Sequence, residues 1–222
     1  MRLSNEHMTK TALAVEALRD AILRGEITQD EPLTVTHLAA QLGMSPTPVR
    51  EAIRTLQAEG LLRLEPHHSA SVTQYSVKDI HDIFQLRADL ESQATRLAVP
   101  RLNDSQIARL DDMQRAMREA AQRSDIEQLN RLNADWHLLI YGAAENRVLL
   151  EVVQHLWKKF MFEINWIQSD GAERSLEQHD RLLAAIHARD ADAAALAIRA
   201  HIQRAEGVAI EYSESRMQRG AR

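Results

Sequence analysis

The sequence contains no cysteine, and this absence excludes disulfide bridges and thiolate metal ligands. Chain-breaking residues are also scarce, with seven glycines and five prolines among 222 residues, and aromatic side chains make up only 4%. No eighteen apolar residues run together, so a membrane-spanning helix is not expected. The net charge of −5 gives no bulk electrostatic argument for nucleic-acid binding, so such a function must rest on a local motif. We expect a soluble, cytoplasmic protein.

The residues that are abundant favour helices. Ala, Leu, Arg, Glu and Gln dominate, and strand-like apolar runs are rare outside LLRLEPHHSASVTQ, residues 61–74. The length and the 45% hydrophobic content suit one or two compact cores. We therefore predict a mainly α protein with two domains, one over residues 1–75 and an all-helical one over residues 76–222.

The first domain shows the element order of a winged helix-turn-helix. Apolar positions recur at helical spacing before Gly25, from a cap at Thr34 or Thr36 to Gly43, and from a cap at Ser45 to Gly60. A glycine between two steeply crossing helices supplies the positive φ that a short turn needs. Residues 61–74 then predict a small β-hairpin, the wing.

The outward face of the third predicted helix carries side chains suited to DNA. Ser45, Thr47, Arg50 and Arg54 can contact phosphates and base edges, and arginine can pair bidentately with guanine. The alternative is an ordinary three-helix bundle with a polar exterior. The continuous stretch LAAQLGMSPTPVREAIRTLQAEGLL, residues 38–62, resembles the DNA-binding region of the GntR superfamily of bacterial transcription regulators. That resemblance implies a cytoplasmic homodimer that binds double-stranded, palindromic operator DNA through Ser45, Thr47 and Arg50.

The second domain is predicted to be an antiparallel bundle of about six helices. Capping residues, glycines and a proline delimit spans at 77–98, 104–122, 125–142, 146–168, 173–188 and 191 to about 213. Ser76, Asn103 and Ser124 are the expected caps of the first three helices. The last residues, EYSESRMQRGAR, lose the apolar stripe, and we expect a frayed tail there.

Three histidines of the bundle are candidates for one site. Asn133 precedes His137 by one helical turn and shares its face, whereas Asp135 points about 200° around the axis. His179 and His201 each lie eleven residues from Asp190, in the connection between the last two helices, so they should face each other. Converging imidazoles are costly to bury unless they are hydrogen-bonded or ligate a cation. The alternative for Asn133 and His137 is a buried hydrogen-bonded pair.

The same spacing resembles the FadR-type C-terminal FCD domain, the effector-binding bundle of one GntR branch. NADWH, residues 133–137, matches the opening of its metal site, while EQHDRLLAAI and IRAHI supply the later histidines. The resemblance implies a divalent metal held by Asn133, His137, His179 and His201; zinc is the first expectation, and nickel, manganese and iron are alternatives. Arg87 and Glu91 match an Arg and a Glu of that domain, so Arg87 is either an effector ligand or the ion-pair partner of Glu91.

The function that we predict is ligand-responsive transcription regulation. Three neutral imidazoles and an amide leave the +2 charge of a bound cation uncompensated, so a small carboxylate effector is expected at the open positions of the metal. A metal-dependent hydrolase using the three histidines is the alternative. That alternative lacks a convincing general base, because Asp135 points away and Glu177 lies on a different helix face from His179. We therefore predict a regulator and no enzyme activity.

Overall fold

The protein is represented by a computed structural model, which describes residues 9–23, 27, 33–64, 70–73, 75–159 and 171–220. The chain divides into two compact units, Met1–Gln74 and Tyr75–Arg222. Each has its own hydrophobic core. Within the described residues no helix is both long and apolar enough to cross a membrane.

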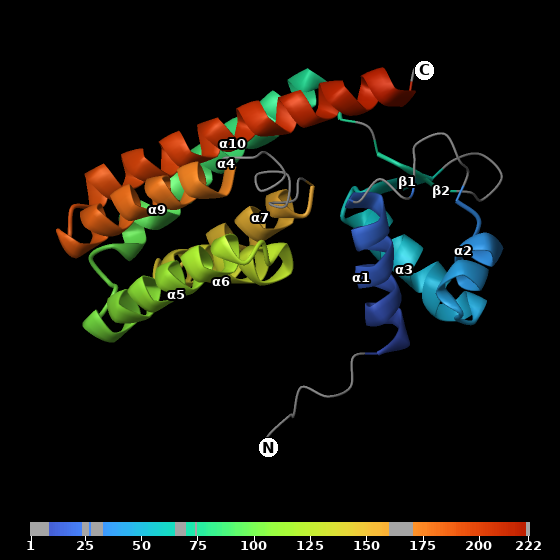
Figure 1. Ribbon diagram of the computed structural model, residues 1–222, viewed down its shortest axis with the longest axis horizontal. Coiled ribbons are helices and arrows are strands. Elements are labelled where there is room, and N and C mark those ends of the chain that lie inside the picture. The colour runs from blue at the N-terminus through green and yellow to red at the C-terminus, as the bar shows by residue number, and fades with distance from the viewer. Residues whose placement is uncertain are drawn as a thin grey trace. The chain divides into compact units, whose positions relative to one another are not determined.

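The N-terminal unit is a winged helix-turn-helix, as the sequence predicts. Its described residues form three helices and two short strands, which Figure 1 labels: α1 (Lys10–Leu23), α2 (Val35–Leu42), α3 (Pro46–Ala58), β1 (Leu62–Leu64) and β2 (Ala70–Val72). The strands are antiparallel, with Arg63 opposite Ser71. Buried apolar side chains of all three helices, among them Leu18, Leu38 and Leu56, form the core. The predicted turn at residues 66–69 lies outside the described residues.

The turn between α2 and α3 follows from local chemistry. The Thr34 hydroxyl accepts a hydrogen bond from the His37 amide at 3.2 Å and caps α2, so Thr34 rather than Thr36 starts that helix. Gly43 ends α2 in the left-handed region, with φ of 61°. Ser45 occupies the N-cap of α3, but its hydroxyl makes no capping hydrogen bond. The Ser45 side chain therefore does not fill the capping role that the sequence suggested.

The C-terminal unit contains only helices in its described part, in agreement with the predicted bundle. They are α4 (Val77–Ala98), α5 (Asp104–Gln122), α6 (Ile126–Gly142), α7 (Arg147–Trp157), α9 (Gly171–His187) and α10 (Ala191–Gly220). Ser76 and Asn103 form capping boxes with Asp79 and Gln106. Ser124 does not cap α6: it takes a positive φ of 56°, and Asp125 accepts the bond from the Gln128 amide instead.

Two helix ends differ from the prediction. The α7 helix ends at Trp157 rather than near residue 168, and residues 160–170 lie outside the described part of the chain. The α10 helix continues to Gly220, past the predicted end near residue 213. The tail sequence loses its apolar stripe but holds no proline, and no glycine before Gly220, so nothing breaks the helix even though none of residues 211–215 is buried.

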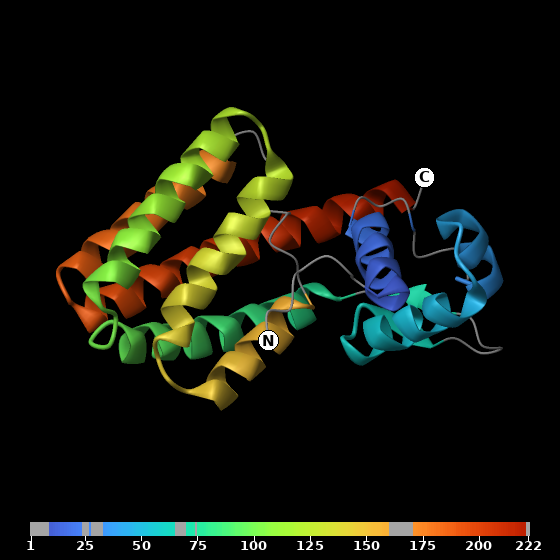
Figure 2. The ribbon, with the colours of Figure 1, turned by 90° about the horizontal axis from the view of Figure 1, so that it is seen from below.

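The bundle places α4 and α10 side by side and antiparallel (Figures 1 and 2). Pairs along their length fix the alignment, with Arg96 bonded to Asp192 at 2.8 Å and His81 to Glu206 at 2.7 Å. The α9 helix packs against both α10 and α5, and α5 packs against α6. This arrangement brings α6, α9 and α10 around one interior point.

Candidate metal centre

Three helices each contribute one buried histidine to the interior of the C-terminal unit. His137 of α6, His179 of α9 and His201 of α10 are 1%, 0% and 7% exposed. Their ring centroids are separated by 5.0 Å between His137 and His179, 4.9 Å between His179 and His201, and 5.3 Å between His137 and His201. One nitrogen from each ring lies within 4.8 Å of the others, so a single ion could contact all three.

Asn133 lies on the same face of α6 as His137, one turn earlier. It is buried, and its Oδ1 atom has no hydrogen-bond partner in the described structure. An unpaired buried carbonyl oxygen costs roughly 1–3 kcal/mol, so its presence calls for a ligand. Asp135 is exposed, which agrees with its predicted direction away from the site.

The histidines are held in the neutral form that metal ligation requires. Burial, followed by the neighbouring His179 and His201 rings and the Arg87 charge, lowers the pKa of His137 well below its ordinary value. Burial is also the main cause for the other two rings: the pKa of His179 falls well below 6.5, and that of His201 falls to about 4. The site therefore offers three uncharged imidazoles.

The donor set fits a divalent cation of borderline softness. Neither ring nitrogen of His179 has a hydrogen-bond partner in the described structure, although the residue is fully buried. His201 has one hydrogen-bond partner, because its Nδ1 lies 3.1 Å from Gln178 Oε1. The amide oxygen can only accept, so Nδ1 of His201 carries the proton and Nε2 keeps its lone pair. Three imidazoles and an amide oxygen suit zinc, nickel, manganese or iron in its 2+ state.

Aromatic residues and Glu91 surround the histidines, and sequence reasoning missed the contacts of Tyr141 and Trp157 with Glu91. Trp136 stacks on His179, with ring centroids 4.5 Å apart and planes 15° from parallel. Trp157 is buried and donates to Glu91 at 2.9 Å. Tyr141 also donates to Glu91, at 2.7 Å. The signals were present, because Tyr141 follows His137 by four residues and Glu91 follows Arg87 by four.

Arg87 forms the ion pair that was one of its two predicted roles. Its Nε donates to Glu91 at 2.8 Å, and the two side chains are 4% and 1% exposed. The guanidinium lies near enough to His137 and His201 to lower the pKa of both. If Arg87 also bound an effector, it would do so while its guanidinium is already paired with the buried Glu91 carboxylate.

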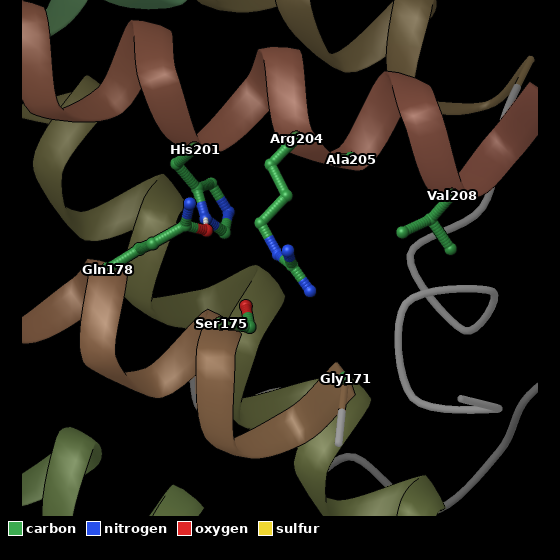
Figure 3. A pocket seen from close by; sticks show the side chains of 7 residues that line it. All are labelled: Gly171, Ser175, Gln178, His201, Arg204, Ala205 and Val208. Atoms are coloured by element: carbon green, nitrogen blue, oxygen red, sulfur yellow. Dashed lines mark hydrogen bonds between the residues drawn. The ribbon is translucent and has the colours of Figure 1, made fainter. Parts of the chain in front are cut away.

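A pocket lies beside His201, between α9 and α10 (Figure 3). The Arg204 side chain reaches from α10 into the space beside His201 and above Ser175. Gln178 and Gly171 contribute the α9 side of the lining. Sequence reasoning missed Arg204, although it follows His201 by three residues and so shares its helix face.

The candidate DNA-contacting residues lie together at the start and along the outer face of α3. Ser45, Thr47, Arg50 and Arg54 are all exposed. Arg54 is bonded to Glu51 at 2.9 Å, whereas Arg50 has no ion-pair partner among the described residues. Both arginines are exposed cations of this face, and Arg54 shares its charge with Glu51.

Comparison with known proteins identifies both units. Residues 10–72 match the model for bacterial regulatory proteins of the gntR family, and residues 82–204 match the FCD domain. The Nta operon transcriptional regulator of Aminobacter aminovorans is 33% identical over 174 residues, covering 78% of this chain and 82% of that protein. A probable D-xylose utilization operon transcriptional repressor of Paenarthrobacter nicotinovorans is 30% identical over 207 residues, covering 91% of each.

Solved structures agree with these relatives. The structure of McbR/YncC from E. coli superposes with a TM-score of 0.76 at 26% identity and covers 93% of this chain and 99% of that one. The relatives are named as transcription regulators, which gives the hydrolase alternative no support. The chain belongs to the gntR family of bacterial regulatory proteins, in the FadR-type branch with a C-terminal FCD domain, and it is a DNA-binding transcription regulator rather than an enzyme.

Proposed function

We propose that this regulator responds to a small organic acid that binds at a divalent metal in the C-terminal unit. The observation that carries the proposal is the buried cluster of His137, His179 and His201, whose ligand atoms lie within 4.8 Å of one another. The unpaired Oδ1 of Asn133 and the two unpaired nitrogens of His179 support it, because a dry site with these atoms is costly without a ligand.

The charge of the site favours an anionic effector. When bound, the ion would act as a Lewis acid with open positions for oxygen ligands. Asn133 and the three histidines are uncharged donors, so they leave the +2 charge of the ion uncompensated. One or two carboxylates would supply the missing negative charge. Zinc is the first candidate, with nickel, manganese and iron as alternatives.

Two arginines, Arg87 and Arg204, add positive charge near His201. Arg87 is buried and already paired with Glu91, so we propose that it contributes mainly through its positive charge, which adds to burial in lowering the pKa of His201. Arg204 lines the pocket and can approach an effector directly. A guanidinium and a carboxylate can form a two-point hydrogen-bonded pair. We therefore propose Arg204 as the direct effector contact, with Arg87 contributing through its charge.

The remaining parts of the proposal concern assembly. We infer that the regulator is a cytoplasmic homodimer on a palindromic operator, because two copies of α3 would then meet two equivalent half-sites. Ser45, Thr47, Arg50 and Arg54 are the proposed contacts. Effector binding would alter DNA binding only if it stabilises one arrangement of the dimer more than another.

Metal analysis combined with thermal-shift screening tests the proposal. Protein that has been stripped with a chelator and reloaded with zinc should retain about one ion per chain. Its melting temperature should rise with members of a panel of sugar acids, hydroxy acids and dicarboxylates. His179→Ala should lose both the ion and the ligand response. His155→Ala is the matched control, since His155 is exposed on α7 and outside the cluster.

The outcomes separate the two parts of the proposal. Unchanged zinc content in His179→Ala would reject the shared site. A panel that yields only neutral ligands would reject the carboxylate effector while leaving the metal in place.

A further inference from the structure

Glu91 of α4 is a buried carboxylate that accepts hydrogen bonds from three helices. Its Oε1 accepts from Arg87 Nε of α4 at 2.8 Å and from Trp157 Nε1 of α7 at 2.9 Å. Its Oε2 accepts from the Tyr141 hydroxyl of α6 at 2.7 Å. A buried carboxylate can only accept, so all three partners are fixed as donors. The geometry therefore determines where the Tyr141 proton lies.

The position of that proton determines the tautomer of His137. The phenol of Tyr141 has a single hydroxyl proton. That proton is given to Glu91. The Tyr141 oxygen also lies 3.2 Å from His137 Nδ1, and with its proton already used it can only accept there. Nδ1 of His137 must then be the N–H, and Nε2 must carry the lone pair.

We infer that Tyr141 and Glu91 are positioning residues that fix His137 as the Nδ1–H tautomer and so present Nε2 as its metal-ligating atom. The inference rests on the metal site of the proposed function. A carboxylate that acts through a neighbouring group on a ligating imidazole sets both its ring orientation and its basicity. Here the phenol of Tyr141 stands between the carboxylate and the imidazole.

The same hydrogen bonds connect His137 to α4, the first helix of the C-terminal unit. Glu91 belongs to α4, which begins at Val77, five residues after β2 of the DNA-binding unit ends at Val72. Trp157 ties α7 to the same carboxylate and also lies edge-on to His137, with ring centroids 6.2 Å apart. A change in the position of the His137 ring would therefore affect the contacts of α4 and α7 as well as those of α6.

Tyr141→Phe removes the hydroxyl and retains the ring, and it is the central test. Zinc affinity of the full-length protein is measured by competition with a chromophoric chelator, and we expect about a 10- to 100-fold loss. The tautomer of His137 is measured on metal-free, ¹⁵N-histidine-labelled protein by long-range ¹H–¹⁵N correlation. The wild type should show the Nδ1–H form, and the variant should lose that preference.

Thr95→Val is the matched control. Thr95 is a fully buried hydroxyl on α4 that donates to the Glu91 carbonyl oxygen at 2.9 Å and belongs to the same helix as the carboxylate. Its loss should lower stability while leaving zinc affinity and the tautomer unchanged. A drop in zinc affinity of the same size in Thr95→Val would show a merely structural effect and overturn the inference.

The two readouts also distinguish failure of the inference from failure of the proposed function. Wild-type affinity for zinc together with the Nδ1–H form in Tyr141→Phe would overturn the positioning role. If the wild type bound no zinc, the metal proposal would fail, and an Nε2–H signature in the metal-free wild type would overturn the tautomer assignment independently.

Discussion

At the scale of single residues, Asn133 sets the charge of the candidate metal site. An amide oxygen one turn before His137 supplies a donor without a negative charge. Asn133→Asp would place a carboxylate in the same position, which attracts a cation and repels an anionic effector. We predict that zinc affinity rises by about tenfold or more while affinity for the carboxylate effector falls, because the charge acts over a short distance in a buried site. Chelator competition and calorimetric titration measure the two affinities.

The control for this change is an amide-to-carboxylate exchange at an exposed position outside the cluster. Gln122→Glu makes the same amide-to-carboxylate change at an exposed position at the end of α5 and should leave both affinities nearly unchanged. Weaker zinc binding and tighter effector binding in Asn133→Asp would refute the charge argument.

Arg50 is the residue on which we predict that operator binding most depends. It is exposed on α3, and no described residue neutralises it, unlike Arg54 with its bond to Glu51. Arg50→Ala should weaken operator binding by roughly 1–3 kcal/mol per subunit, which abolishes a shifted band at ordinary concentrations. A gel-shift titration on an operator fragment selected by the wild-type protein measures the loss.

Arg147→Ala tests whether any exposed arginine gives the same effect. Arg147 lies on α7 near Glu151 and carries the same charge outside the DNA-binding unit. It should not change operator affinity. Undiminished binding by Arg50→Ala would remove α3 from the recognition role that its exposed face suggests.

At the scale of elements, Gly43 supplies the backbone conformation of the turn between α2 and α3. Its φ of 61° lies in the left-handed region, although no atom within 4 Å would meet an added Cβ. The penalty for Gly43→Ala is therefore backbone strain alone, roughly 1–2 kcal/mol. We predict that amides of α2 and α3 exchange hydrogen about 5- to 30-fold faster than in the wild type.

Gly142→Ala is the comparison for that prediction. Gly142 is the last residue of α6, and an added Cβ there also meets no atom within 4 Å. Because its φ is not in the left-handed region, exchange in α6 should be unchanged or slightly slower. Equal exchange in Gly43→Ala and the wild type would show that the turn tolerates the strain.

Most elements could be predicted because their ends carry chemical signals. The capping boxes at Ser76 and Asn103 and the glycine at position 43 mark helix boundaries in the sequence itself. The end of α7 has no such signal, so its predicted span was too long. The α10 helix was predicted too short because apolar periodicity reports burial, whereas an exposed helical extension needs only the absence of breakers.

The candidate site was only partly predictable for a related reason. The pairing of His179 with His201 follows from equal distances to one turn, which is information local to a helical hairpin. The contacts of Glu91 with Tyr141 and Trp157 join residues that are 50 and 66 positions apart on three helices. No spacing rule gives the crossing of those helices, so the network required the structure.

At the scale of the whole molecule, the proposed homodimer makes a prediction about its operator. Two recognition helices related by a twofold axis reach half-sites about 34 Å apart, or one turn of DNA, only when both half-sites lie on the same face of the duplex. Inserting five base pairs between the half-sites turns one of them to the opposite face. We predict that this insertion reduces affinity to near the non-specific level, by about 10³-fold or more, in a binding titration at fixed salt.

An insertion of ten base pairs provides the control, because it returns both half-sites to the same face of the duplex and changes only the distance between them. Affinity should recover in part if the dimer can lengthen its reach, and it should stay low if the separation is fixed. In either case the affinity for the operator with five inserted base pairs must be no higher than the affinity for the operator with ten. Wild-type affinity for the five-base-pair insertion would mean that each chain binds its half-site independently. The twofold arrangement would then have no part in operator recognition, and an effector at the metal site could not act by changing the separation of two DNA-binding units.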